Sequence, residues 1–255
     1  MKNHLFLTLF ASLLVLGEHT FAQKITIGAK GGFSIPNLTG GSTDNPLNTG
    51  YSSRLANDGG IYGEYHVNKK FAVTVGLEYS SQGGLKNGLQ ALPNPIPPPT
   101  YLYANIKNEA KLNYLLVPLL AKYNWRLNKK SPIRIYVALG PFAGLLLNAK
   151  QVSSGTSRIF MNPDGTVPIS EPTIFNSSIS IKNQLYTFNA GVEGFVGISY
   201  SIDKRHALFI EGGANYGFLS IQKGTANGKN YTGAGVFNFG YAYTLQNKYG
   251  QRGRR

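Results

Sequence analysis

The fold is decided by the segment Phe71-Ala72-Val73-Thr74-Val75-Gly76-Leu77-Glu78-Tyr79-Ser80. Large apolar side chains occupy its odd positions, and small or polar side chains occupy its even positions. Because the side chains of a β-strand alternate between its two faces, this period of two predicts a strand with one apolar and one polar face. Residues 185–200 repeat the pattern, interrupted at Gly194 and Phe195.

The same alternation predicts eight strands along the chain. Most of them reach the length of about 9–11 residues that a tilted membrane-spanning strand needs. The predicted strands cover residues 24–33, 58–67, 71–81, 111–125, 133–147, 185–200, 207–219 and 232–245. After the N-terminal segment, the longest apolar run, Leu115 to Ala121, contains Pro118 and is too short for a spanning helix.

The connections between these strands alternate between long and short. The long ones, residues 34–57, 82–110, 148–184 and 220–231, are rich in Gly, Pro, Asn, Ser and Thr, whereas residues 68–70, 126–132 and 201–205 are short. Bacterial outer-membrane barrels have long extracellular loops, short periplasmic turns and an even number of strands. We therefore predict an all-β fold, an eight-stranded antiparallel up-and-down transmembrane β-barrel in the outer membrane of a Gram-negative bacterium.

The two ends of the chain are predicted to lie outside this barrel. Lys2 and an apolar run from Leu5 to Leu16 are typical of a secretory signal peptide, cleaved between Ala22 and Gln23. The alternative, a retained anchor helix, is disfavoured because the run is too short to span a membrane. We expect residues 1–22 to be the signal peptide, 23–245 the barrel, and 246–255 a basic periplasmic tail, either disordered or a binding arm.

The amino-acid composition limits the classes of partner and of chemistry that we expect. The net charge of +14 arises from 25 basic and only 11 acidic residues. We expect contacts with outer-membrane lipids and lipopolysaccharide, and with envelope proteins through the outer loops or the tail. The export signal and the dispersed lysines argue against nucleic acid. The absence of cysteine excludes a thiol nucleophile and thiolate metal ligands.

Charged side chains are predicted inside the barrel once its apolar face is turned toward lipid. An eight-stranded barrel has an interior just wide enough to be filled by side chains, and buried carboxylates need partners. We expect a structural ion-pair network there, with a narrow ligand or ion conduit as the alternative. Its members are Lys30, Glu64, Glu78, Lys122, Arg134, Glu193 and Glu211.

Aromatic residues lie near both ends of the predicted strands. Such residues form girdles at the two interfaces of a membrane barrel. The predicted girdle residues are Tyr65, Phe71, Tyr123, Trp125 and Tyr200 beside the short turns, and Tyr79, Tyr186 and Phe218 near the long loops.

Catalysis is not predicted. His66 and His206, the histidines outside the signal peptide, lie toward the short turns, whereas outer-membrane barrel enzymes generally work near their outer loops. Glu64 and Glu78 could form a carboxylate dyad, but structural pairing in a filled interior is favoured. The loop acids Asp44, Asp58 and Asp164 are too scattered to predict a metal site, and no cofactor is expected.

A proline run from Pro93 to Pro99 is the most unusual loop feature. Polyproline geometry would stiffen the second long loop there, either as a contact surface or as a spacer.

The segment Asn113-Tyr114-Leu115-Leu116-Val117-Pro118-Leu119-Leu120-Ala121-Lys122-Tyr123 resembles a strand of the PorT-like outer membrane β-barrel family of Bacteroidota. As in that family, a short turn and a strand containing Gly140-Pro141 follow. Leu116 departs from the pattern, because the family often carries a polar or acidic residue there. The resemblance implies a membrane barrel and, in some members, a part in secretion and gliding.

The sequence thus predicts a non-enzymatic outer-membrane barrel with a side-chain-filled interior, acting through its extracellular loops or in envelope organisation. The alternatives are a PorT-like component of a secretion and gliding machinery, and a narrow ligand or ion conduit.

Overall fold

Eight long strands form a closed ring in the computed structural model, which describes residues 24–41, 46–47, 50–96, 100–128, 131–224 and 228–245. Each strand pairs antiparallel with the next along the ring, and β1 pairs with β10 to close it. The predicted eight-stranded antiparallel barrel is therefore confirmed. The ring consists of β1 (Lys24–Gly40), β2 (Ala56–His66), β3 (Phe71–Pro93), β4 (Tyr101–Arg126), β5 (Ile133–Ser157), β8 (Phe188–Ser201), β9 (His206–Gly217) and β10 (Asn230–Leu245).

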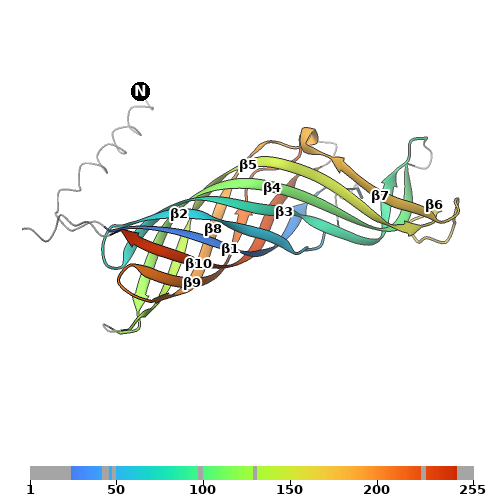
Figure 1. Ribbon diagram of the computed structural model, residues 1–255. Helices are drawn as coiled ribbons and strands as arrows, with labels where there is room; N and C mark the ends of the chain where they lie inside the picture. Colours follow the sequence, from blue (N-terminus) through green and yellow to red (C-terminus); the bar gives the residue numbers. More distant parts are fainter. Residues whose placement is uncertain are drawn as a thin grey trace, which may run out of the picture.

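Both ends of the ring's chain lie at the same end of the barrel. Lys24 at the start of β1 pairs with His66, and Ile25 pairs with Leu245 at the end of β10. The short turns lie at this end, and the long connections lie at the other (Figure 1). The predicted signal peptide, the basic tail, Asp44 and Pro97–Pro99 lie outside the described residues.

Two of the predicted long loops are largely strands, which corrects the sequence analysis. Beyond the barrel, β3 and β4 continue as a hairpin that ends with Pro93 opposite Tyr101, and β5 continues to Ser157. The short strand β6 (Ile159–Phe160) pairs with β4, and β7 (Thr173–Ser180) pairs with β5. We call residues 82–93, 101–112 and 148–157 together with β6 and β7 the projecting sheet.

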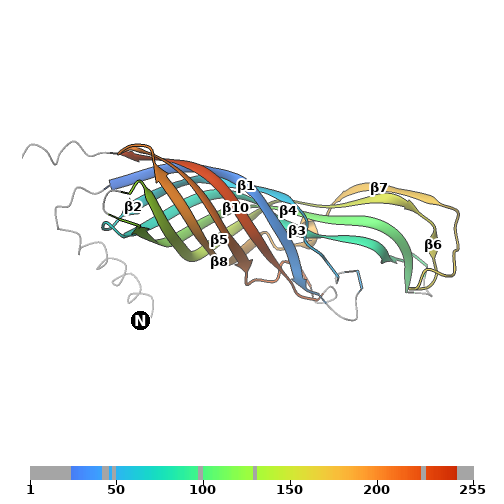
Figure 2. The same ribbon diagram turned by 90° about the horizontal axis from the view of Figure 1, so that it is seen from below.

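The projecting sheet extends past one side of the barrel rim (Figures 1 and 2). It escaped prediction because its strands lack the apolar stripe of the barrel strands. Lys107, Glu109 and Lys111, for example, occupy successive outward positions of β4, where the barrel portion of that strand carries Leu115, Val117 and Leu119.

The outer surface of the barrel wall is apolar. Large side chains such as Ile61, Leu139 and Phe239 are 60–65% exposed. The opposite face of each strand points into the barrel and carries small, polar and aromatic residues, with buried leucines such as Leu116 and Leu146 on β4 and β5. So much exposed apolar surface is typical of a lipid-facing wall. No helix of membrane-spanning length and hydropathy occurs among the described residues.

Two backbone irregularities mark the place where the projecting sheet leaves the barrel wall. Gly83 in β3 has φ +119°, and a Cβ atom there would lie 1.9 Å from the carbonyl oxygen of Ala110. The register between β4 and β5 shifts by one residue at Asn113 and Tyr114. Such irregularities bend strands and redirect them. Glycine is required at position 83 by both its φ angle and its close contact with β4.

We predict that Gly83→Ala weakens the projecting sheet, because alanine meets both an unfavourable φ angle and the carbonyl of Ala110. The opening free energy of residues 84–110, measured by native-state hydrogen exchange, should fall by about 1–3 kcal/mol. Gly63→Ala is the matched control, since Gly63 has no heavy atom within 4 Å of a built Cβ. An equal change in both variants would contradict this role of Gly83.

Candidate functional site

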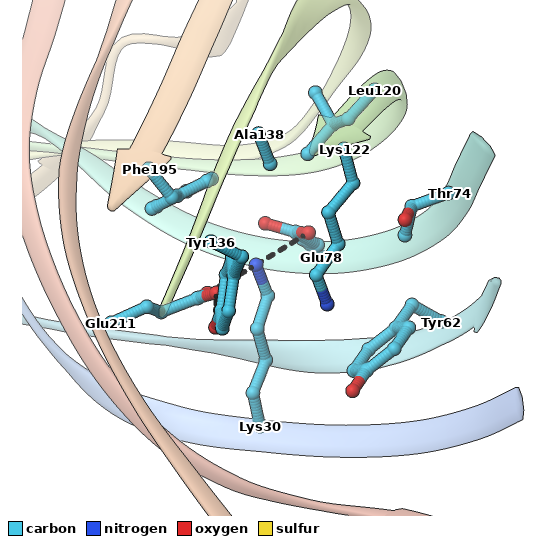
Figure 3. Close-up of a pocket in the computed structure, with 10 residues that line it drawn as sticks. All are labelled: Lys30, Tyr62, Thr74, Glu78, Leu120, Lys122, Tyr136, Ala138, Phe195 and Glu211. Atoms are coloured by element: carbon cyan, nitrogen blue, oxygen red, sulfur yellow. Dashed lines mark hydrogen bonds and ion pairs between the residues drawn. The ribbon is translucent and has the colours of Figure 1, made fainter. Parts of the chain in front are cut away.

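A buried lysine links three strands in the barrel interior. Lys30 Nζ on β1 lies 2.8 Å from Glu78 Oε1 on β3 and 3.0 Å from Glu211 Oε1 on β9. The hydroxyl of Tyr136 on β5 donates a hydrogen bond of 2.8 Å to the other oxygen of Glu211. Lys30 also lies over the ring of Phe195, 4.4 Å from its centroid. Figure 3 shows these side chains converging from different strands.

A second ion pair lies closer to the short turns. Lys122 Nζ on β4 is 2.7 Å from Glu64 Oε2 on β2, and it lies 4.0 Å from the ring centroid of Tyr136. His66 Nε2 is 3.3 Å from the other oxygen of Glu64 and 2.9 Å from Thr26 Oγ1. Glu64 and Glu78 therefore bind different lysines, and the geometry offers no shared-proton carboxylate dyad.

The residues predicted in the interior do not all belong to one network of ion pairs. The structure brings Lys30, Glu78 and Glu211 together, and separately Lys122 and Glu64. Arg134 interacts electrostatically with Glu64 but forms no ion pair within 4 Å with a described acidic residue. Glu193 on β8 is 1% exposed, and neither of its carboxylate oxygens has a hydrogen-bond partner among the described residues. The structural role assigned to the whole set stays a proposal.

Asp58 is the charged interior residue that the sequence analysis placed wrongly, among the loop acids. It lies in β2, is 7% exposed, and accepts a hydrogen bond of 3.4 Å from Asn238 Nδ2. A signal was present, since Asp58 has the same parity as Glu64 and His66 on one strand. Tyr136 was also missed, although it shares the parity of Arg134 on β5.

Little space remains between these side chains. A cavity of about 30 Å³ lies beside Lys30, Tyr62, Glu78 and Glu211 (Figure 3). A cavity of that size holds no more than about two water molecules. Toward the long-loop end, an apolar cluster fills the interior with Tyr114, Leu116, Phe142, Leu146 and Leu185.

The predicted girdle residues lie on the outer surface of the barrel. Beside the short turns, Tyr123 packs against Phe71 and Trp125, with ring centroids 4.6 and 4.4 Å apart. Tyr65 and Tyr200 are exposed at the same end, and Tyr79, Tyr186 and Phe218 are exposed toward the other end. Their contact with lipid headgroups is a proposal.

The histidines lie far from the projecting sheet. His66 belongs to the interior, and His206 begins β9, where its ring nitrogen contacts the hydroxyl of Tyr241. No group of three or more His, Cys, Asp or Glu side chains in the described part of the chain is arranged to hold a metal ion.

The projecting sheet carries its own charged groups. Lys86 Nζ donates hydrogen bonds of 2.9 and 2.8 Å to the carbonyls of Pro46 and Leu47 and lies 4.7 Å from the ring centroid of Tyr51. Burial lowers the pKa of Lys86 to about 8. On the opposite face, Lys107 and Lys111 flank Glu109 at 2.6 and 3.1 Å and lower the pKa of its carboxyl group.

We predict that Lys30→Met strongly destabilises the barrel, because Glu78 and Glu211 would lose their buried cation. Removing one partner of a buried pair typically costs about 3–5 kcal/mol. Lys107→Met is the matched control, since the Lys107 side chain is 48% exposed and Glu109 keeps its pair with Lys111, so the loss should be about 0–1 kcal/mol. Urea titration of both variants, refolded in the same detergent, compares the two losses. Losses of similar size would contradict a dominant role for Lys30.

We also predict a pH effect from Lys86. Because its folded-state pKa of about 8 lies below its ordinary value of 10.5, the charged form is disfavoured in the fold. The resulting decrease in the free energy of unfolding is complete below pH 8, and it disappears as the pH rises from 8 toward 10.5. The urea midpoint of the wild-type chain should therefore gain more between pH 7 and pH 10 than that of Lys86→Met. Identical gains in the two proteins would contradict the prediction.

Comparison with known proteins agrees with this architecture. A family model described as "Outer membrane protein beta-barrel domain" matches residues 21–223. No curated protein matches the chain.

Among solved structures, the chain is similar to the outer membrane protein OprG from Pseudomonas aeruginosa, with 13% identity, 90% of this chain and 98% of that one covered, and a TM-score of 0.44. A major outer membrane protein from Thermus thermophilus has 12% identity, coverage of 88% and 100%, and a TM-score of 0.45. The outer membrane protease OmpT from Escherichia coli has 9% identity, coverage of 89% and 98%, and a TM-score of 0.49. No shared activity follows from likenesses this distant.

Proposed function

We infer the function from the family: the chain belongs to the outer membrane protein beta-barrel domain family and therefore lies in the outer membrane. We propose that it acts there through its projecting sheet and not through a pore. In this proposal the protein is non-enzymatic, and its partners are envelope or extracellular proteins that contact the sheet. Cleavage of a signal peptide between Ala22 and Gln23 belongs to the same proposal.

The observation that carries the proposal is the continuity of β3, β4 and β5 from the barrel into the projecting sheet. Closing a β-hairpin needs only about 2–5 residues. Here the strands continue far beyond the length that a hairpin connection requires. Their backbone groups stay paired, β3 with β4 and β5 with β7. A paired sheet anchored on a closed barrel is a rigid platform, and rigid scaffolds position binding residues well.

Orientation follows the rule that short turns of such barrels face the periplasm. The projecting sheet then lies outside the cell. Its outward surface mixes charged residues with exposed apolar side chains, including Ile174 and Ile179 on β7, which are 76% and 60% exposed. A surface of this composition can bind a protein partner by apolar contact framed by polar groups.

The barrel interior supports the choice of the sheet over a conduit. The Lys30 and Lys122 ion pairs occupy one part of it, and the apolar cluster around Tyr114 occupies another. The cavity of about 30 Å³ beside Lys30 holds about two water molecules and is too small for a sugar or an amino acid. A ligand or ion conduit is therefore the weaker candidate.

A role in a secretion and gliding machinery is the second candidate. The observation in its favour is the resemblance of residues 113–123 to the PorT-like family of Bacteroidota. In this chain, Leu116 packs in the apolar cluster instead of presenting a polar group to the interior. Loss of secretion or gliding on deletion of the gene would favour this candidate over a general role in the envelope.

Site-specific photo-crosslinking in intact cells tests the projecting sheet directly. A photoreactive amino acid at Asn105 or Ser178, both exposed on the sheet, should give discrete protein adducts. The matched controls are Val67 and Ile202, each 57% exposed at the short turns. Adducts formed from the control positions alone would contradict a sheet that binds partners.

A further inference from the structure

A group of lysines lies where the projecting sheet joins the barrel wall. Lys111 on β4 and Lys150 on β5 are direct cross-strand partners, and both side chains are on the outward face. Lys182, at the start of the 3-10 helix η1 (Lys182–Gln184), donates a hydrogen bond of 2.9 Å to the carbonyl of Leu147. Lys223 Nζ lies 3.3 Å from the carbonyl of Asn183 and donates to it. We call these four lysines the lysine arc.

The arc lies next to the apolar wall of the barrel. Along β5, the exposed residues Leu145 and Leu147 precede Lys150, and Lys182 is bonded to Leu147 itself. Tyr186 and Phe188 follow η1 and are 50% and 56% exposed. The arc therefore combines cations with an apolar surface immediately toward the membrane, as a lipid with an anionic headgroup requires.

The positive charge of the arc is poorly balanced by protein groups. Glu109 pairs with Lys111, but it is shared with Lys107. Lys150, Lys182 and Lys223 form no ion pair with a described acidic residue. Two further acidic residues belong to the outer portion of the described chain. These residues, Asp164 and Glu171, follow β5 in the sequence and lie in the segment beside β6.

The pairing of Lys111 with Lys150 is itself unfavourable. Like charges directly opposite each other on neighbouring strands destabilise a sheet. An anion held between them would remove this repulsion. Strands lie only about 4.8 Å apart, so one phosphate group can contact lysines from both.

We propose that the lysine arc binds the phosphate groups of lipopolysaccharide, with the lipid's acyl chains against Leu145, Leu147, Tyr186 and Phe188. This inference shares with the proposed function the assumption that the long-loop end faces outward. It does not depend on a protein partner, because the residues of the arc differ from the crosslinking positions on the sheet. Lipopolysaccharide is the anionic lipid of the outer leaflet, and the arc adjoins the exposed apolar residues Leu145 and Leu147 of the barrel wall.

The test uses the purified full chain in neutral detergent and fluorescently labelled lipopolysaccharide. The triple variant Lys150→Gln, Lys182→Gln, Lys223→Gln should bind the lipid about 10- to 100-fold more weakly than wild type. Each lysine that is lost removes part of the electrostatic attraction to the anionic headgroup. The matched control replaces Lys69, Lys70 and Lys204 of the short turns by Gln and should stay within about twofold of wild type. Replacing Lys150, Lys182 and Lys223 by Arg should preserve binding, because the charge is kept.

Two further measurements separate the candidate ligands, and a third checks that each variant is folded. Lipopolysaccharide stripped of its phosphates should bind wild type as weakly as the intact lipid binds the triple Gln variant. Inorganic phosphate at millimolar concentration should not compete, and effective competition would indicate a free-phosphate site and overturn the lipid assignment. The difference in gel migration between heated and unheated samples, which reports folding of the barrel, should be the same for wild type and all variants. Equal binding by wild type and by a folded triple Gln variant, or equal loss in the short-turn control, would also overturn the proposal.

Discussion

The pairing of β1 with β10, from Ile25 opposite Leu245 to Gly40 opposite Asn230, closes the sheet on itself. Within a membrane this closure satisfies the backbone groups that an open edge would leave unpaired in lipid. Eight strands closed in this way leave an interior of roughly side-chain width. The wall must then be apolar on the outside, while every group that points inward must pack with or bond to another.

The interior shows how this constraint is met. Asp58, Glu64, Glu78, Glu193 and Glu211 all lie on inward faces, and their cationic contacts include Lys30 and Lys122. Because these contacts join β1 to β3 and β9, and β2 to β4, they hold strands that are not neighbours in the ring at fixed positions. We propose that this network specifies a unique arrangement of strands more than it adds net stability, since burying ion pairs carries a large desolvation cost. That cost is least compensated at Glu193, whose carboxylate has no hydrogen-bond partner in the described part of the chain.

Much of this architecture was predictable from alternation in the sequence. The period of two predicted the eight barrel strands, and strand parity placed Lys30, Glu78 and Glu211 inside. Parity does not reveal which inward groups meet, because contacts between distant strands depend on the tilt and stagger of the barrel. For that reason the ion pair of Lys122 with Glu64 required the structure. The projecting sheet was missed because Gln82 to Leu92 lacks a lipid-facing stripe, and Asp58 was misplaced by treating a strand-end acid as part of a loop.

We propose that the barrel is filled and that the protein acts outside the membrane through its projecting sheet, and single-channel recording tests that central claim most directly. The purified full chain, inserted in a planar bilayer, should show no steady conductance steps at neutral pH, because the ion pairs and the apolar cluster around Tyr114 fill the interior. Steady, reproducible open-channel steps from the folded chain would contradict the account and would favour the conduit.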